Sequence, residues 1–459
     1  MASFFRSPQR DQAFLLPPSV KDWLPKNDFT WFLIDAVATM DLKAFRAHFS
    51  KDGRGQPAYD PEMMVALLLY AYSHGERSSR KIERLCERDV AFRVIAGNLK
   101  PDHTSIANFR KTFENEIKGL FIAALALCKE AGLSKAGTIA IDGSKLSGNA
   151  ALSANRTREG LEEEVTRILS EANAEDEAED KLYGSKRGDE IPQEFHDPRS
   201  RMSRIKECLS RLKAKEEAVE NERKQKAAER SAKETSSGKK LRGRKPGDGS
   251  KEKAPKANPT DPESRIMKTA KAFVQGYNAQ AAANEHQIIL AAKVTQEEND
   301  QKQLHPILKE VQSNLAAVHE EHGPKIVLAD AGYATTTVLA QKAPDGVEFI
   351  MATTKDWKEK KAMKNEPPPR GRIPTATSPR ERMHRKRMTK RGKRLYRLRS
   401  QIIEPIFGQI KSAQGIDTFC RRGLNACDSE WKLICASHNL LKLWRKDHKG
   451  KKKGNGSDK

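Results

Sequence analysis

The pattern of apolar and polar positions divides the chain into a helical first part and a mixed later part. Residues 11–130 carry apolar side chains at helical spacing, interrupted by turns that contain glycine. Asp60 followed by Pro61 is a typical helix start, because aspartate accepts from first-turn amides and proline fits the first helical position. The pattern predicts several short helices, the last over residues 104–113.

Short helices joined by tight turns are typical of helix-turn-helix DNA-binding units and equally of a plain helical bundle. If the unit binds DNA, residues 104–113 form the better candidate for groove contact, and Arg110 and Lys111 are its basic residues. The pattern alone leaves both interpretations open.

A second pattern begins at residue 138, where short β-branched runs alternate with helical segments. Residues 138–141 predict a strand that Asp142 follows as the chain leaves the sheet. Further predicted elements are an antiparallel hairpin (272–280 and 287–295), a helix capped by Asn299-Asp300, a strand (325–329), a helix (334–343) and a strand (347–352). This order predicts an α/β fold, a mixed sheet flanked by helices.

Residues 151–264 are rich in charged side chains and separate the first predicted strand from the later ones. An acidic run over 161–180 precedes a basic segment, 199–240, whose apolar residues are spaced for one helix face. The Gly/Pro/Lys-rich return, 239–262, predicts disorder. We interpret 151–264 as a charged helical insertion with a flexible basic return.

Composition narrows the class of partner. The 459 residues are 37% hydrophobic and carry a formal net charge of +23, which favours a polyanion, nucleic acid first. No apolar run approaches the roughly 20 residues that cross a membrane, and no secretion signal is recognisable. The six cysteines include no Cys-x-x-Cys pair, so we expect a cytoplasmic protein without a zinc or disulfide framework.

The positive charge is concentrated late in the chain. Residues 355–399 hold 18 Lys/Arg against 4 Asp/Glu, a net +14. Such a run is often a solvated tail, but this one leads directly into Glu404, which favours a clamp on a phosphate backbone.

Three carboxylates on separate elements are candidates for chemistry. Asp142 and Asp330 each follow a short apolar run, and Glu404 lies among apolar residues. Individually they read as turn residues or a surface ion pair. Together they suit hard divalent cations such as Mg²⁺, and two such ions can activate the attacking oxygen and stabilise the leaving one in phosphoryl transfer.

The ordered motifs resemble bacterial insertion-sequence transposases of the DDE class, in the IS-four/IS-five-like superfamily. The matching segments are Ile139-Ala-Ile-Asp142-Gly-Ser-Lys-Leu-Ser-Gly-Asn149, Gln275-Gly-Tyr-Asn-Ala-Gln280, Val327-Leu-Ala-Asp330-Ala-Gly-Tyr333, Tyr396-Arg-Leu-Arg399, Glu404-Pro-Ile-Phe-Gly-Gln-Ile-Lys411, His438-Asn-Leu-Leu-Lys442 and, for the helical beginning, residues 55–115. The resemblance implies an RNase H-like catalytic core.

The resemblance also implies roles for these residues. Asp142, Asp330 and Glu404 would be the catalytic, metal-binding triad, served by two Mg²⁺ ions with Mn²⁺ able to substitute. A tyrosine–arginine–glutamate–lysine signature that contacts the cleaved DNA end would comprise Tyr396, Arg399 and Lys411 with the triad glutamate.

One departure from the signature leaves its arginine open. Four residues separate Arg399 from Glu404, where the signature has three, and Arg397 would share the Glu404 face of an ideal helix better. Lys411 shares that face only if the helix runs straight through Pro405, which disfavours it. The helix is therefore expected either to kink at residues 404–405 or to restart there.

The expected organisation has four parts. Residues 1–133 form a helical DNA-binding domain, 134–150 with 265–445 the RNase H-like catalytic domain, 151–264 the insertion, and 446–459 a disordered basic tail. The resemblance implies a nucleoid-associated enzyme that binds the terminal inverted repeats of its element, cleaves them and transfers them into target DNA, as a homodimer or higher oligomer. The alternatives are a metal-dependent nuclease without strand transfer and a non-catalytic, transposase-derived DNA-binding protein.

Overall fold

The computed structural model describes residues 19, 22–49, 58–168, 170, 201–238, 255–269, 272–341, 346–354, 371–372 and 377–454. The statements below concern these residues. Most of the acidic run (171–180) and most of the first half of the basic run (355–370 and 373–376) lie outside them.

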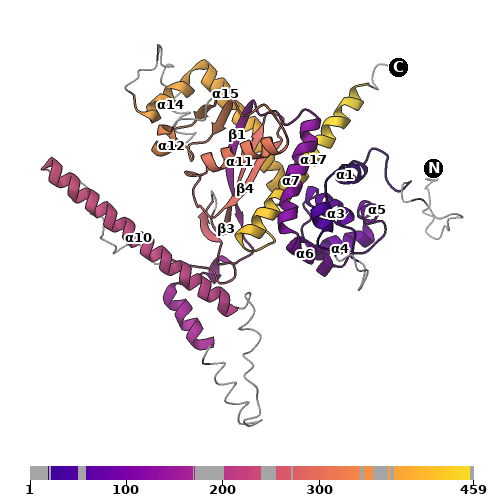
Figure 1. Ribbon diagram of the computed structural model, residues 1–459, viewed down its shortest axis with the longest axis horizontal. Coiled ribbons are helices and arrows are strands. Elements are labelled where there is room, and N and C mark those ends of the chain that lie inside the picture. The colour runs from indigo at the N-terminus through magenta and orange to yellow at the C-terminus, as the bar shows by residue number, and fades with distance from the viewer. Residues whose placement is uncertain are drawn as a thin grey trace, which may run out of the picture.

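The first part of the chain is helical, as the sequence predicts. Its helices are α1 (Phe29–Ala38), α2 (Lys43–Arg46), α3 (Pro61–Ser73), α4 (Ser79–Arg88), α5 (Val90–Ile95), α6 (His103–Thr112) and α7 (Glu114–Glu130). Asp60 caps α3 by accepting from the amide of Glu62, with Pro61 in the first turn. α3 is buried along most of its length, and α7 lies between this cluster and the sheet (Figure 1).

The last helix, α17 (Leu424–Gly454), packs on α7, α3 and the sheet. It continues through Gly454, so the predicted disorder of the tail is wrong for residues 446–454; residues 455–459 lie outside the description. Extending a helix costs little once its earlier turns are fixed by packing, because only the first turn carries the nucleation penalty.

A six-stranded mixed sheet forms the second part. Its strands are β1 (Thr138–Ser147), β2 (Arg265–Lys268), β3 (Phe273–Asn284), β4 (Ile289–Thr295), β5 (Ile326–Ala329) and β6 (Glu348–Met351). The order is β2-β3-β1-β5-β6, with β4 also paired to β3. β1 is antiparallel to β3 and parallel to β5, which is parallel to β6. This mixed α/β arrangement is consistent with an RNase H-like core, as expected.

Alternate residues of β1 face two separate apolar cores. Ile139 and Ile141 pack in the core that contains α11 (Leu304–Ala317), whereas Ala140 packs in the core that contains Trp431 of α17. The period of two that defines a strand therefore places helices against both faces of the sheet.

Two sequence predictions need correction, and one strand was missed. β1 does not end before Asp142 but continues to Ser147, because β3 pairs with it as far as Gly276. β2 was not predicted; its four residues are basic at both ends and apolar between, without the alternation of a strand, and they form a strand by pairing with β3. Asp300 does not cap a helix, since α11 begins after Gln303.

The insertion leaves the sheet after β1 and returns at β2. Its helix over residues 158–168 packs on α10 (Arg201–Ser237) through a small core of Leu161, Ile205, Cys208 and Leu212. α10 then projects away from the body of the molecule (Figure 1).

The end of the return segment is ordered, contrary to the prediction of disorder. Asn258 and Asp261 are buried and paired: the Asn258 Nδ2 donates to Ala151 O at 2.8 Å, and the Tyr277 hydroxyl donates to Asp261. Buried polar side chains with such partners fix a segment that composition alone describes as flexible.

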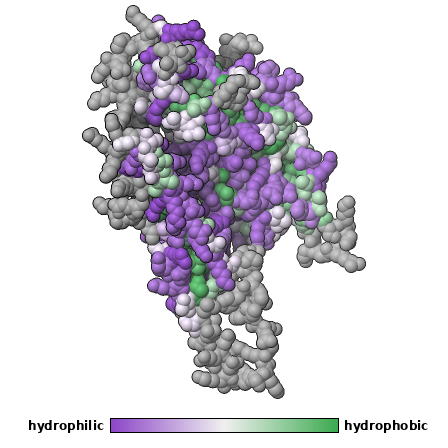
Figure 2. Space-filling model, turned by 60° about the vertical axis from the view of Figure 1, so that its left-hand side comes forward, coloured by the Kyte–Doolittle hydropathy of each residue, from purple (hydrophilic) through white to green (hydrophobic). Residues whose placement is uncertain are grey.

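The surface is strongly polar. In the view of Figure 2, hydrophilic side chains cover most of the visible face and apolar ones gather only in small patches. Among the described residues, no helix is both long and apolar enough to cross a membrane.

Asn439 joins α17 to β4 and gives a test of this packing. It is fully buried; its Nδ2 donates to Ile289 O at 2.9 Å, and its Oδ1 accepts from Ile289 N at 2.8 Å. In Asn439→Ala both backbone groups lose their partner inside the core. We expect the free energy of unfolding in urea to fall by about 2–5 kcal/mol. The control Asn425→Ala, on an exposed part of the same helix, should cost less than about 1 kcal/mol, and equal losses would contradict this assignment.

Candidate catalytic site

The parallel pairing of β1 with β5 brings Asp142 and Asp330 to one edge of the sheet. Ala140 lies opposite Leu328, so two further residues along each chain lead to Asp142 and Asp330. Asp330 ends its strand in a turn in which Gly332 N donates to its Oδ1 at 2.9 Å. This register therefore brings the two carboxylates to the same edge of the sheet.

The surroundings of Asp142 oppose its negative charge. Burial raises its pKa to about 6; the positive charge of Arg399 works against this rise, and the negative charge of Asp330 adds to it. A cation placed between the two aspartates would favour their ionised forms and relieve their repulsion.

Glu404 begins a new helix rather than continuing the preceding one. α15 (Lys390–Ile402) ends, and α16 (Glu404–Gly408) starts with Pro405 in its first turn, where proline fits because it needs no amide donor. The Glu404 side chain is 56% exposed, and it accepts from Arg399. The helix restart alternative left by the sequence is therefore the one observed.

Arg399 links two of the three carboxylates. Its Nη2 donates to Asp142 Oδ2 at 2.7 Å and its Nη1 to Glu404 Oε1 at 3.2 Å, while its side chain is only 9% exposed. Arg397 is exposed. Of the two candidate arginines, Arg399 is the one within the carboxylate cluster.

The other signature residues lie close to the same region but make different contacts. Lys411 lies in a π-helical turn (Gln409–Ala413), and its Nζ donates to Lys145 O at 3.0 Å, so it does not form a straight-helix pair with Glu404. The ring of Tyr396 lies 4.1 Å from the Arg387 guanidinium carbon. Both side chains are half-buried.

The two basic residues predicted on α6 differ in exposure. Lys111 is exposed, but Arg110 is buried and donates to the Tyr72 hydroxyl at 3.1 Å and to Arg77 O at 2.7 Å. The guanidinium of Arg110 therefore holds α6 against the rest of the helical domain. The prediction that Arg110 contacts DNA is not supported.

A fourth carboxylate, Asp300, lies beside the cluster and was missed by sequence reasoning. Its Oδ1 accepts from Asn278 Nδ2 at 2.7 Å, Gln280 Nε2 at 2.7 Å and Lys145 Nζ at 3.2 Å. Gln280 in turn accepts from the hydroxyl of Tyr333, three residues after Asp330. This network ties β1, β3 and the Asp330 turn together.

A sequence signal for this network existed in β3. Asn278 and Gln280 occupy alternate positions of an otherwise apolar run, so they share one face, and both are fully buried. Buried amides need partners, which implies a polar network on that face.

Gly143 is required by the close approach of this network. A Cβ at this position would lie 2.1 Å from Gln280 Nε2 and 2.6 Å from Asp300 Oδ1. Gly143→Ala should push these groups away and misplace Asp142, lowering the rate of DNA cleavage by about 10- to 100-fold. The control Gly137→Ala, where a Cβ would meet nothing within 4 Å, should keep both the rate and the melting temperature. A Gly143→Ala protein with an unchanged rate would show that the network does not position Asp142.

The carboxylates are the right chemistry for a divalent metal. Within the described part of the chain, no group of three or more His, Cys, Asp or Glu side chains is arranged to hold a metal ion. Asp142 and Asp330 supply oxygen ligands at one edge, and the guanidinium of Arg399 stands between Asp142 and Glu404 as a cationic partner. Carboxylate oxygens are the ligands that a hard cation prefers, so Asp142, Asp330 and Glu404 are its candidate ligands, and Arg399 would have to leave its place between Asp142 and Glu404 for all three to bind one metal centre.

Comparison with known proteins gives two matches to family models. Residues 18–112 match a transposase domain (DUF772), and residues 238–440 match a transposase DDE domain. The second match spans β2 to β6 and includes Asp330 and Glu404. No curated protein and no solved structure matches the chain.

Proposed function

The chain belongs to the DDE transposases, and from this premise we propose that it binds the terminal inverted repeats of its own element, cleaves a strand at each end and joins the freed 3′-hydroxyl to target DNA. As a transposase it acts on DNA by phosphoryl transfer, and its family generally uses divalent metal ions. We propose further that the specific substrate is the pair of element ends, that strand transfer is the second step, and that the enzyme acts at the nucleoid.

The observation that carries this proposal is that the fold brings Asp142 and Asp330 to one edge of the sheet and connects Glu404 to Asp142 through Arg399. Asp142 and Asp330 are aligned by the β1–β5 register, and Arg399 joins Asp142 to Glu404. Such a cluster repels a phosphate unless cations neutralise it, and this is the arrangement expected of a metal-dependent phosphoryl transferase.

We propose the following roles, which this geometry supports. Asp142, Asp330 and Glu404 would hold two Mg²⁺ ions, which when bound polarise the scissile phosphate and lower the pKa of the attacking water or hydroxyl. Arg399, whose positive charge favours the ionised form of Asp142, would turn toward phosphate oxygens once DNA enters. The Asp300 network would keep Asp142 and the Asp330 turn in a fixed relation.

Basic residues and one tyrosine around the cluster would bind the DNA end. We assign this role to Arg399, to the exposed Arg397 and to Lys411 and Tyr396, with Lys111 as a contact from the helical domain. Holding two ends at once requires at least two active sites, so we propose a synaptic homodimer or higher oligomer. Light scattering of the chain with end DNA should then give a mass of two or more protomers per complex.

A joining assay separates this proposal from a nuclease without strand transfer. Duplexes that carry the DNA flanking the gene, pre-cut to expose a 3′-hydroxyl, are incubated with the full-length chain, a plasmid and Mg²⁺. We expect plasmid molecules covalently joined to the duplex. Cleavage of uncut ends without any joined product would instead identify a nuclease.

A further inference from the structure

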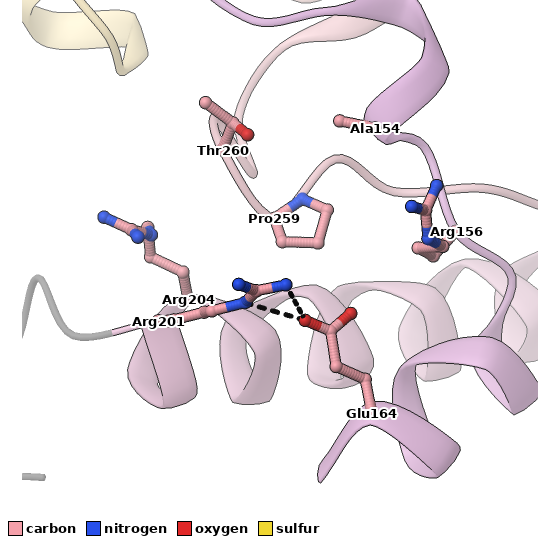
Figure 3. A pocket seen from close by; sticks show the side chains of 7 residues that line it. All are labelled: Ala154, Arg156, Glu164, Arg201, Arg204, Pro259 and Thr260. Atoms are coloured by element: carbon pink, nitrogen blue, oxygen red, sulfur yellow. Dashed lines mark hydrogen bonds and ion pairs between the residues drawn. The ribbon is translucent and has the colours of Figure 1, made fainter. Parts of the chain in front are cut away.

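A cavity at the root of the insertion is lined by three arginines (Figure 3). Its volume is about 230 Å³. Arg156 follows a short 3-10 turn (Leu152–Ala154), and Arg201 and Arg204 occupy the first turn of α10. Spaced three apart on a helix, the last two present their side chains on the same face.

The cavity carries more positive charge than its own residues neutralise. Glu164 is its one carboxylate, and it pairs with Arg201, whose Nε donates to it at 2.7 Å. Arg156 donates through Nη1 to two backbone carbonyls, of Ser153 and Asn155. Among the described residues, the buried Nε of Arg204 finds no acceptor. The lining therefore has a surplus of two positive charges.

The arrangement of the guanidinium groups indicates the shape of the anion. In Figure 3 they do not converge on one point: Arg204, Arg201 and Arg156 are spread across the cavity beneath Thr260, Pro259 and Ala154. A compact anion is bound best by donors that converge on one point. Guanidinium groups that are spread apart suit a chain of phosphates, because each planar guanidinium can donate two hydrogen bonds to one phosphate.

The cavity is fixed to the strand that supports the candidate catalytic site. Asn155 Nδ2 donates to Gln275 Oε1 at 2.9 Å, and Arg156 exchanges backbone hydrogen bonds with Ala257. Gln275 belongs to β3, which pairs with β1 along the segment that carries Asp142. An anion bound in the cavity is therefore held in a fixed relation to the carboxylate cluster.

We propose that this cavity binds the sugar-phosphate backbone of duplex DNA at a position away from the scissile phosphate. The inference rests on the proposed function, because it supposes that DNA is the substrate, and it adds a second anchoring site on the insertion. Backbone contacts fix the register of a duplex without reading its sequence. The insertion would thus set where the DNA lies relative to the carboxylates.

The test uses the full-length chain and a duplex of arbitrary sequence several helical turns long, with affinity measured by fluorescence anisotropy over a range of salt concentrations. The slope of log K against log salt is negative, and each lost phosphate contact reduces its magnitude by about 0.9. In the double variant Arg201→Gln/Arg204→Gln the magnitude of the slope should therefore fall by about 2, and binding should weaken at every salt concentration tested. The control Lys206→Gln/Lys213→Gln removes the same charge from exposed positions of α10 outside the cavity and should leave the slope unchanged.

Two further variants separate DNA binding from a structural role. Arg201→Lys/Arg204→Lys keeps the charge and should retain most of the affinity. Glu164→Gln frees Arg201 and removes the negative charge, so it should strengthen DNA binding, whereas a merely structural ion pair would make it harmful.

Opposite results would overturn the proposal. The first is an unchanged slope in Arg201→Gln/Arg204→Gln. The second is an equal change of the slope in the control Lys206→Gln/Lys213→Gln, and the third is weaker DNA binding by Glu164→Gln. If the unaltered chain binds and cleaves DNA while the double variant keeps its slope, only the cavity proposal fails. If the unaltered chain binds no duplex, the proposed function fails with it.

Discussion

Asp330→Asn should remove end cleavage by the full-length chain, with a fall in rate of at least about a thousandfold. Asp330 reaches the cluster only because β5 pairs with β1, and its carboxylate lies beside that of Asp142. The amide keeps the shape of the side chain but loses the charge that attracts a divalent cation. Nicking of a supercoiled plasmid that carries the DNA flanking the gene, in Mg²⁺, measures the effect. Asp142→Asn and Glu404→Gln should behave in the same way.

The matched control is Glu298→Gln, an exposed carboxylate two residues before Asp300. It should cleave at the unaltered rate. If Asp142→Asn, Asp330→Asn and Glu404→Gln all retained cleavage, the catalytic assignment would be wrong. An equal loss in Glu298→Gln would point to general destabilisation instead.

Arg399→Met should lower the cleavage rate at pH 7 by about a hundredfold and change its pH dependence. Arg399 holds the pKa of Asp142 down against burial and against Asp330, and even so that pKa is about 6. Without the guanidinium the pKa rises, so a larger fraction of Asp142 is protonated at neutral pH. A carboxyl with a raised pKa ionises only at higher pH; the variant should therefore gain activity with rising pH in a range where the unaltered chain has reached its plateau.

Arg397→Met provides the comparison, because it removes the same charge two residues away at an exposed position. It should weaken DNA binding but leave the pH profile of cleavage in place. Identical pH profiles for Arg399→Met and the unaltered chain would show that Arg399 does not control the ionisation of Asp142.

The sequence predicted the elements that carry the two aspartates, because their strand signals are local. The apolar, β-branched runs before Asp142 and Asp330 identify β1 and β5 without any long-range information. For Glu404 the sequence left two alternatives, a helix kink or a new helix with Pro405 in its first turn, and the structure has the new helix. The mixed sheet and the helical beginning followed from the order of such signals.

The features that were missed depend on contacts between distant segments. Asp300 resembles a helix cap in sequence, and only the pairing of β1 with β3 brings Lys145, Asn278 and Gln280 to its side chain. Arg110 resembles a surface residue until α3 supplies the hydroxyl of Tyr72. Composition cannot show which polar residues will find buried partners.

Iron-directed cleavage of the protein backbone tests the central claim most directly, since it locates the bound metal without relying on activity. Fe²⁺ replaces Mg²⁺ in the full-length chain, and with ascorbate and peroxide it generates radicals that cut the nearest backbone. We predict cuts close to residues 142, 330 and 404, suppressed by excess Mg²⁺ and absent in Asp330→Asn. Cuts confined to other segments, or cuts at these three positions that persist in Asp330→Asn, would contradict a metal site built from these carboxylates.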